Sequence, residues 1–310
     1  MTKYAPIALF TYSRADHTQT AVESLLRNKE ASETDLYIFS DGPKTEAKAA
    51  AVAENRRYIR TITGFKSIHI VEREKNWGLA NSLIAGITEV INQYGRVIVV
   101  EDDLTLSPYF LHFMNEALEK YKDDDRVSTI SGFCPVTETA LPDTYFLQFF
   151  HCWGWATWKR AWDLANWDVR YLLRKMRFKV RKFDIDGTVG SYGNLYCQKV
   201  GLVDSWYIRL YASFFLAGKL TLFPCRSLVH NTGLDGTGTH CGTALMETAS
   251  AVAYVEQPVT MSDIPVVESR EAYAAFREAY RKDLPPTSWA KRNYDRFKSF
   301  VRRLLFIDCS

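Results

Sequence analysis

The chain has 310 residues, 47% of them hydrophobic and 24% charged, which is typical of one large soluble domain or two lobes that share a core. A net charge of only +3 argues against a dedicated nucleic-acid-binding protein, which usually has a strongly basic surface. The six cysteines form no C-x-x-C pair, no signal peptide is recognised and no apolar run reaches the roughly 18 residues of a membrane helix. We therefore expect a cytoplasmic protein with free thiols and no zinc site.

The first hundred residues alternate short apolar runs with helical patterns. We expect strands at residues 6–12, 35–40, 67–71 and 96–100, separated by helices at 16–26, 44–62 and 79–94. This alternation predicts an α/β fold with a mostly parallel central sheet flanked by helices. In the first helix, the residues expected to face the core are Ala21, Val22, Leu25 and Leu26.

After residue 104 the alternation weakens. The pattern predicts a helix at 108–121, a loop-rich and aromatic-rich stretch to about 165, a basic cluster at 170–182, a helix at 203–217 and a strand at 219–223. Residues 229–243 are rich in glycine and are expected to form a mobile loop, and the chain from about 270 looks helical and basic. We expect three parts, namely 1–104, 105–260 and a C-terminal extension at 261–310.

Three acids, Glu101, Asp102 and Asp103, follow four apolar β-forming residues. They would lie at the carboxyl end of a strand, which is where ligands bind in open α/β sheets. Adjacent carboxylates repel unless a positive charge lies among them, and a hard divalent cation, Mn²⁺ or Mg²⁺, is the natural partner. Such an ion takes further ligands from substrate phosphates and would stabilise a departing diphosphate. The alternative is a solvated acidic loop that caps the next helix.

Polar residues also follow the other strands of this half: Arg14, the Asp41-Gly42 turn and Asn76-Trp77-Gly78. Arg14 could pair with a phosphate, and Asp41 could accept a hydrogen bond from a base or ribose. Each has a simpler explanation, since Arg14 could cap a helix and Asp-Gly is a common turn. Because neither a P-loop sequence nor a glycine-rich first turn is present, P-loop and dinucleotide-binding motifs are excluded.

Taken in order, these motifs resemble those of GT-A fold glycosyltransferases. The stretch Val99–Leu104 is similar to the Glu-Asp-Asp form of the metal motif in N-acetylglucosaminyltransferase I-like enzymes, which invert the anomeric centre. Two later stretches, 153–158 and 231–240, resemble blocks of bacterial polysaccharide-biosynthesis glycosyltransferases. The resemblance covers roughly residues 5–245.

The resemblance implies a Rossmann-like GT-A domain in which 1–104 binds the nucleotide-sugar and 105–260 binds the acceptor. Asp103 would bind the metal. His240, in the glycine-rich loop, could ligate the metal or contact the diphosphate, although a lone histidine in a loop is often simply exposed. The residues expected around the donor, a UDP-sugar because Asp41 matches a uracil-contacting carboxylate, are Thr11, Arg14, Asp41, Asn76, Gly78, Asp102 and Trp155. The acceptor would be a lipid-linked glycan of bacterial surface polysaccharide, and no nucleic acid is expected as a partner.

An inverting transferase needs a general base that deprotonates the acceptor hydroxyl. Asp204, shortly before Trp206 and Arg209, matches the family's catalytic segment, although it could merely cap a helix. Asp184, Asp186 and Asp235 are the reserve candidates.

Two segments, 170–182 and 291–306, interleave basic and apolar residues. Basic amphipathic helices can lie on anionic membranes, so we expect the tail from about 285 to hold the protein at the inner face of the cytoplasmic membrane. A solvated helix face is the alternative.

Two other functions remain open from the residues alone. A sugar-nucleotide nucleotidyltransferase would share the sheet and the acidic metal site, but it would want a glycine-rich loop that residues 10–20 lack. A non-catalytic carbohydrate-binding protein would bind its ligand without metal.

Overall fold

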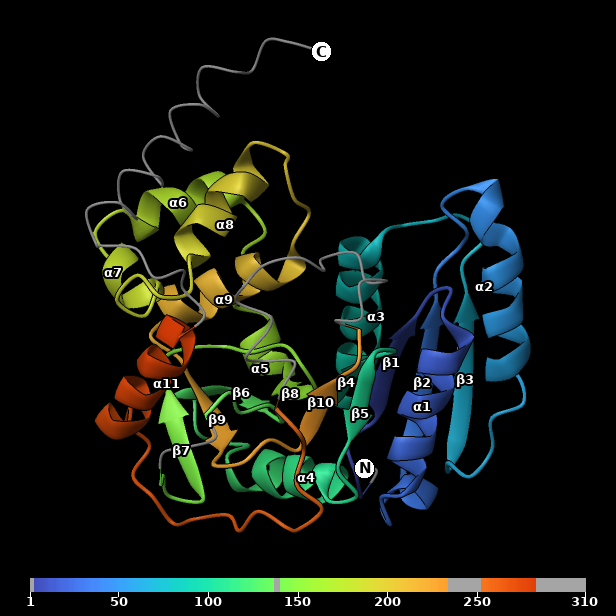
Figure 1. The fold of residues 1–310 in the computed structure, drawn as a ribbon, viewed down its shortest axis with the longest axis horizontal. Coiled ribbons are helices and arrows are strands. Elements are labelled where there is room, and N and C mark those ends of the chain that lie inside the picture. Colours follow the sequence, from blue (N-terminus) through green and yellow to red (C-terminus); the bar gives the residue numbers. More distant parts are fainter. Residues whose placement is uncertain (1–2, 137–139, 234–251, 283–310) are drawn as a thin grey trace.

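A single eight-stranded sheet runs through the protein (Figure 1). The computed structural model describes residues 3–136, 140–233 and 252–282. The strand order is β3-β2-β1-β4-β8-β6-β9-β7, in which β8 and β7 run against the other strands. The expected α/β class with a mostly parallel sheet is thus confirmed.

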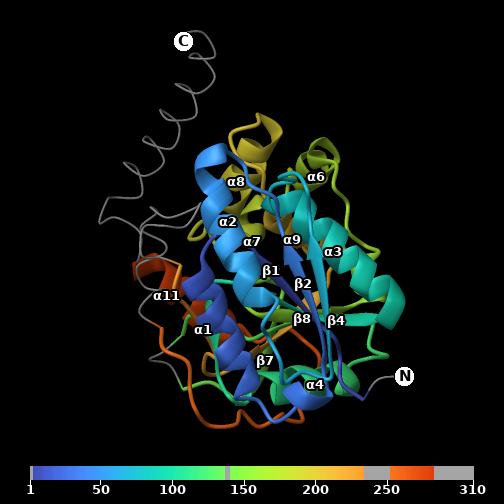
Figure 2. The same cartoon turned by 90° about the vertical axis from the view of Figure 1, so that its right-hand side faces the viewer.

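The first half forms as the alternation predicts. Its elements are β1 (Ile7–Thr11), α1 (Ala15–Leu26), η1 (Ala31–Glu33), β2 (Asp35–Ser40), α2 (Glu46–Ile59), β3 (Ser67–Glu72), α3 (Leu79–Tyr94) and β4 (Arg96–Glu101). The β1 residues Ile7 and Leu9 pack toward α1 and α2, whereas Ala8 and Phe10 pack toward α3. Figure 2 shows these helices on opposite sides of the strands, which explains why β1 is buried throughout.

One residue of α1 was assigned to the wrong face. Ala21, Val22 and Leu25 are buried as expected, but Leu26 is 38% exposed. Leu26 follows Leu25 directly, and the 100° rotation between successive helical residues turns it away from the sheet.

The second half contains β5 (Leu104–Leu106), α4 (Phe110–Lys120), β6 (Val127–Ser131), β7 (Thr144–Leu147), β8 (Trp155–Trp158), α5 (Lys159–Trp162), α6 (Val169–Met176), α7 (Val180–Phe183), α8 (Ser191–Lys199), α9 (Trp206–Leu216), β9 (Leu220–Pro224), β10 (Val229–Asn231) and α11 (Arg270–Lys282). The expectation of loops up to residue 165 was wrong, because β6, β7 and β8 lie there. These strands are only four or five residues long and fully buried, so their pairing partners rather than their own pattern specify them.

The glycine-rich stretch and the tail lie partly outside the described residues. Residues 229–231 were expected in a mobile loop, but they form β10, which pairs with β5. Asp235 and His240, and the tail from 283 onward, are not among the described residues. The predicted helix near 270 is confirmed as α11, whose Phe276 is buried against Phe223, with ring centroids 5.1 Å apart. No described helix is long and apolar enough to cross a membrane.

A glycine in α3 allows the close contact between this helix and the sheet. A Cβ added at Gly86 would lie 2.8 Å from the Phe10 ring and 2.9 Å from the Phe39 ring. We predict that Gly86→Ala lowers the free energy of unfolding by about 1–3 kcal/mol, because buried rings must shift. Gly193→Ala in α8 is the matched control, since no atom lies within 4 Å of its added Cβ. Urea unfolding of both variants tests this, and an unchanged midpoint for Gly86→Ala would contradict it.

Candidate functional site

The carboxyl ends of β1, β2 and β4 bring three of the sequence motifs together. Strand β1 lies between the other two, with Thr11 opposite Ser40 and Phe10 opposite Glu101. Arg14, Asp41 and the Asp102-Asp103 pair therefore follow neighbouring strands at one edge of the sheet. This parallel arrangement places the Arg14 guanidinium and the carboxylates along one edge of the sheet, which we call the rim.

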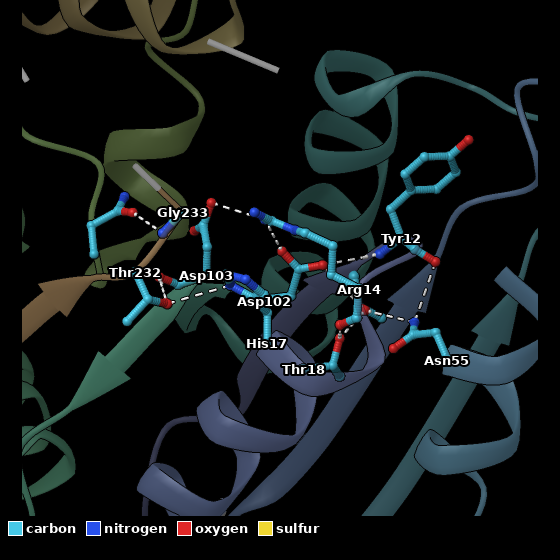
Figure 3. Close-up of polar contacts among 11 residues, drawn as sticks. Tyr12, Arg14, His17, Thr18, Asn55, Asp102, Asp103, Thr232 and Gly233 are labelled. Atoms are coloured by element: carbon cyan, nitrogen blue, oxygen red, sulfur yellow. Dashed lines mark hydrogen bonds and ion pairs between the residues drawn. The ribbon is translucent and has the colours of Figure 1, made fainter. Parts of the chain in front are cut away.

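Arg14 forms ion pairs with both aspartates (Figure 3). Its Nη2 donates to Asp102 Oδ1 at 2.7 Å and to Asp103 Oδ2 at 3.0 Å. Asp102 is only 7% exposed and also accepts a hydrogen bond from the backbone N–H of Tyr12 at 3.2 Å. Arg14 precedes α1, but its side chain makes no capping bond. Its guanidinium is directed at the acids, so helix capping does not explain this residue.

The three acids carry more negative charge than Arg14 neutralises. Burial, followed by the negative charges of Asp103 and Asp102, raises the pKa of Glu101 to about 8. Burial also raises the pKa of Asp102, an effect that the Arg14 charge opposes. A second cation near these carboxylates would favour their ionised forms.

Thr11 is a buried residue that lies against Asp102 and is not exposed at the rim. Its hydroxyl hydrogen-bonds to Thr18 at 2.7 Å and accepts from Asn55 Nδ2 at 2.8 Å, and it lies 3.5 Å from Asp102. Thr11 is 5% exposed, so the structure places it behind the rim, not in a position to contact a donor directly. Asn55 was not singled out from the sequence. It lies within an alanine-rich helix, and its side chain is fully buried.

Asp41 holds together a loop that follows β3. Its carboxylate accepts from the backbone N–H groups of Gly42 and Trp77 at 2.9 Å, and from Gly78 N–H at 2.9 Å. Asn76 Nδ2 donates to the same carboxylate at 3.1 Å and to the Gly42 carbonyl at 2.8 Å. These four donors use the acceptor capacity of the carboxylate. A base that binds Asp41 directly must therefore replace one of these bonds.

Two glycines allow this loop to close. A Cβ on Gly42 would lie 2.5 Å from the carbonyl carbon of Lys75, and Gly78 has a φ of 77°, where a side chain is strained. Trp77, between Asn76 and Gly78, remains 46% exposed with the Arg73 guanidinium 3.6 Å from its ring centroid.

Arg56 of α2, a residue that the sequence analysis did not single out, fixes the ends of β2 and β3. It donates to the carbonyl of Arg73 at 2.7 Å and to that of Asp41 at 3.3 Å. The sequence signal that could have identified Arg56 is a basic residue on the face of α2 that packs against the sheet.

The late glycine-rich stretch begins at the acid cluster. Thr232 donates its N–H and its hydroxyl to the Asp103 carbonyl at 2.8 and 3.0 Å, and its hydroxyl lies 3.4 Å from His17 Nδ1 (Figure 3). Gly233 approaches the Asp103 carboxylate so closely that a Cβ would collide with it. The described chain therefore stops beside Asp103 at Gly233, and His240 lies outside the described residues.

The expectation that Trp155 borders the donor is not met. Trp155 lies in β8 with no exposed surface, and its ring stacks on Trp206 with centroids 5.7 Å apart. The aromatic residue that remains partly exposed in this block is Trp153, which packs edge-on against Phe133 at 4.7 Å. The inward alternation of a buried strand, not sugar binding, accounts for Trp155.

Asp204 is an exposed carboxylate at the entry to α9. It accepts from Arg209 Nη2 at 3.1 Å, and its side chain is 60% exposed. Ser205 caps the helix by accepting from Ile208 N–H, so the capping explanation of Asp204 is wrong. Of the reserve candidates, Asp184 is buried and accepts from Tyr192 N–H at 2.7 Å, and Asp186 is ion-paired to Arg181 at 2.9 Å.

The acid cluster fits a cation that is held mainly by its substrate. Among residues 3–136, 140–233 and 252–282, no three His, Cys, Asp or Glu side chains converge as a complete ligand set. Mg²⁺ and similar ions need only one or two protein carboxylates when phosphates and waters complete the shell. Asp103, 23% exposed and beside Asp102, offers such a partial set.

The Glu101 pKa gives a pH-dependent stability in the metal-free protein. A carboxyl whose pKa is raised on folding stabilises the folded state at low pH, and this contribution is lost as the pH rises toward the folded pKa. In EDTA, the free energy of unfolding should fall by about 1–3 kcal/mol more in the native protein than in Glu101→Gln between about pH 5 and pH 8. Urea unfolding across this range tests the prediction, with Glu46→Gln as an exposed control. Parallel pH profiles for native protein and Glu101→Gln would contradict it.

Relatives of this chain are known in sequence and in structure. The alpha-1,3-mannosyl-glycoprotein 2-beta-N-acetylglucosaminyltransferase of Arabidopsis thaliana is 24% identical over 203 residues, which is 58% of this chain and 44% of that protein. The chain therefore spans less than half the length of this curated relative.

Two solved structures show weak similarity. The mannosyltransferase PcManGT from Pyrobaculum calidifontis, in complex with GDP-Man and Mn²⁺, is 14% identical with a TM-score of 0.36, covering 69% of this chain and 70% of that chain. S. aureus TarS 1-349 is 9% identical with a TM-score of 0.42, covering 74% and 60%.

The family model of glycosyl transferase family 2 matches residues 7–187, from the start of β1 to just beyond α7. This range covers more than half of the chain and includes Arg14, Asp41 and the acid cluster. The match confirms the resemblance to glycosyltransferases on which the sequence motifs agreed. The chain belongs to glycosyl transferase family 2.

Proposed function

We propose that this family member is a metal-dependent, inverting glycosyltransferase that moves a sugar from a UDP-sugar to a glycan. The observation that carries the proposal is the Arg14–Asp102–Asp103 cluster at the carboxyl rim of the sheet. A sugar nucleotide has a diphosphate that suits both a guanidinium and a carboxylate-bound cation. The named activity of the plant relative, transfer of N-acetylglucosamine, supports a hexosyl or N-acetylhexosaminyl donor.

Asp103 is the proposed metal ligand, with Mn²⁺ or Mg²⁺ as the ion. When bound, the cation would supply Lewis-acid stabilisation of the departing diphosphate. Arg14 would keep Asp102 ionised and orient both carboxylates. His240 is proposed as a further ligand or diphosphate contact, because the segment that contains it begins beside Asp103.

The nucleotide is proposed to bind along the loop that Asp41 organises. With its carboxylate committed to Trp77 and Gly78 N–H groups, Asp41 acts first as the residue that shapes the loop. Asn76 and Gly78 belong to the same hydrogen-bonded unit. A uracil ring would be read by this preformed loop, and Asp41 would exchange a loop bond for one to the base.

Asp204 is proposed as the general base. It is exposed to solvent and ion-paired with Arg209, and aspartate is a usual general base in such sites. The acceptor is proposed to be a lipid-linked glycan of bacterial surface polysaccharide, with the enzyme in the cytoplasm at the inner face of the membrane and the tail from about 285 as one anchor. A nucleotidyltransferase would instead release pyrophosphate from sugar phosphate and nucleoside triphosphate.

The metal requirement gives a direct test. Transfer from UDP-sugars should stop in EDTA and return with Mn²⁺ or Mg²⁺, and Asp103→Ala should abolish donor binding as well as turnover. Asp263→Ala, an exposed aspartate, should keep both. A thermal-shift screen of UDP-, GDP- and dTDP-sugars with and without Mn²⁺ reads out binding. Activity that is indifferent to chelation would disprove the metal role.

The general base can be tested separately from donor binding. Asp204→Asn should lower the transfer rate by roughly 10²-fold or more while leaving donor affinity nearly unchanged, because a base acts only in the chemical step. Asp163→Asn is the matched control, an exposed aspartate ion-paired with Lys159 at 2.7 Å. If Asp204→Asn transfers sugar at the native rate, Asp204 is not the base.

A further inference from the structure

The turn between α6 and α7 exposes a large aromatic ring. Leu172 and Met176 of α6 and Phe183 of α7 are fully buried, so the apolar residues that can reach the core do so. Phe178, in the three-residue turn between these helices, is 89% exposed. The Arg177 guanidinium lies 5.2 Å from the centroid of this ring, but the core does not cover it. An aromatic ring among basic residues is a feature of surfaces that bind membranes.

The same turn is surrounded by positive charge. Every charged residue from Val169 to Phe183 is basic: Arg170, Arg174, Lys175, Arg177, Lys179, Arg181 and Lys182. Arg181 pairs with Asp186 at 2.9 Å and Lys182 with Glu268 at 2.8 Å. Within the described part of the chain, the other five make no ion pair with a carboxylate, so their charges are available to an anionic partner.

A groove of about 470 Å³ opens beside Phe178. Its lining includes Lys179, Arg270 and Tyr273, and its two acids, Asp186 and Glu268, are already paired with basic residues. The groove therefore has an excess of hydrogen-bond donors with positive charge, which suits a phosphate group.

We propose that this surface, the α6–α7 turn with its groove, docks onto an anionic lipid membrane. A membrane surface offers what these residues lack: a plane of phosphates for the basic side chains and an apolar interior for Phe178. An acidic peptide would satisfy the charges but would leave the protruding ring in water. A single-stranded RNA could stack a base on the ring, but the net charge of only +3 argues against a nucleic-acid partner. The basic tail carries the same sign of charge and is disfavoured as a cover.

The location of this surface suits an enzyme that acts at a membrane. In Figure 1, α6, α7 and α8 lie at the end of the molecule toward which β1 and β2 point, and α2 lies on the far side. Arg14 follows β1, and the acids follow β4, which runs parallel to β1, so the rim lies at the same end as these helices. The proposed lipid-linked acceptor gives this docking surface its biological role. Membrane binding itself can be measured without sugar transfer.

The test is sedimentation of the full-length protein with phosphatidylcholine vesicles that contain or lack phosphatidylglycerol. The charge variant is Arg177→Gln/Lys179→Gln and the apolar variant is Phe178→Ser. The control is Lys48→Gln/Arg57→Gln, which removes two exposed charges from α2. Each basic residue near an anionic surface is worth about a fivefold factor in partitioning. We expect the native protein and the control to bind anionic vesicles, the charge variant to partition at least about tenfold less, and the apolar variant to lose binding as well.

Several outcomes would overturn the docking surface. These are equal partitioning of all variants, absence of native binding to anionic vesicles, equal binding to neutral vesicles, and binding to a single-stranded RNA but not to vesicles. Unchanged circular dichroism and melting temperature show that the variants fold. UDP-sugar thermal shifts without vesicles separate the two proposals: a docking variant should keep its donor response, whereas failure of the proposed donor function would remove that response from the native protein too.

Discussion

The contact between Arg14 and the Asp102-Asp103 pair is the constraint on which the rim depends. It joins the end of β1 to the end of β4, two strands that are neighbours in the sheet but separated by almost ninety residues of sequence. The charge of Arg14 opposes the rise in pKa that burial imposes on Asp102. Because the two aspartates carry more negative charge than one guanidinium neutralises, the cluster could accept a further cation, as the proposed function requires.

Around this ion pair, further hydrogen bonds fix the geometry. Thr11 and Asn55 lie behind Asp102, Asp41 gathers the loop after β3, and Thr232 ties the late segment to the Asp103 carbonyl. Each partner comes from a different part of the chain. Buried polar groups that are hydrogen-bonded hold such positions firmly, since leaving one unpaired costs free energy. The rim is thereby preorganised before any substrate arrives.

The helices that follow β8 form an aromatic core on their inner side and a basic surface on their outer side. Their inner residues, such as Phe183 against Tyr211 at a centroid distance of 4.5 Å, form an aromatic core. Their outer residues are basic and surround the exposed Phe178. The same group of helices carries Asp204, at the entry to α9, and the positively charged surface on α6 and α7. Under the two proposals above, the general base and the membrane-docking surface would therefore belong to one structural unit.

The sequence by itself determined the α/β class, the elements of the first half and the adjacency of Arg14, Asp41 and the acids, because apolar periodicity and parallel strand ends are local rules. Tertiary structure alone decided the short strands β6, β7 and β8, which pairing specifies, and the burial of Trp155, which resembled a surface aromatic. It also decided the role of Asp41. A carboxylate that follows a strand can read a base or hold a loop, and only the donors brought to it from residues 76–78 show that it holds one.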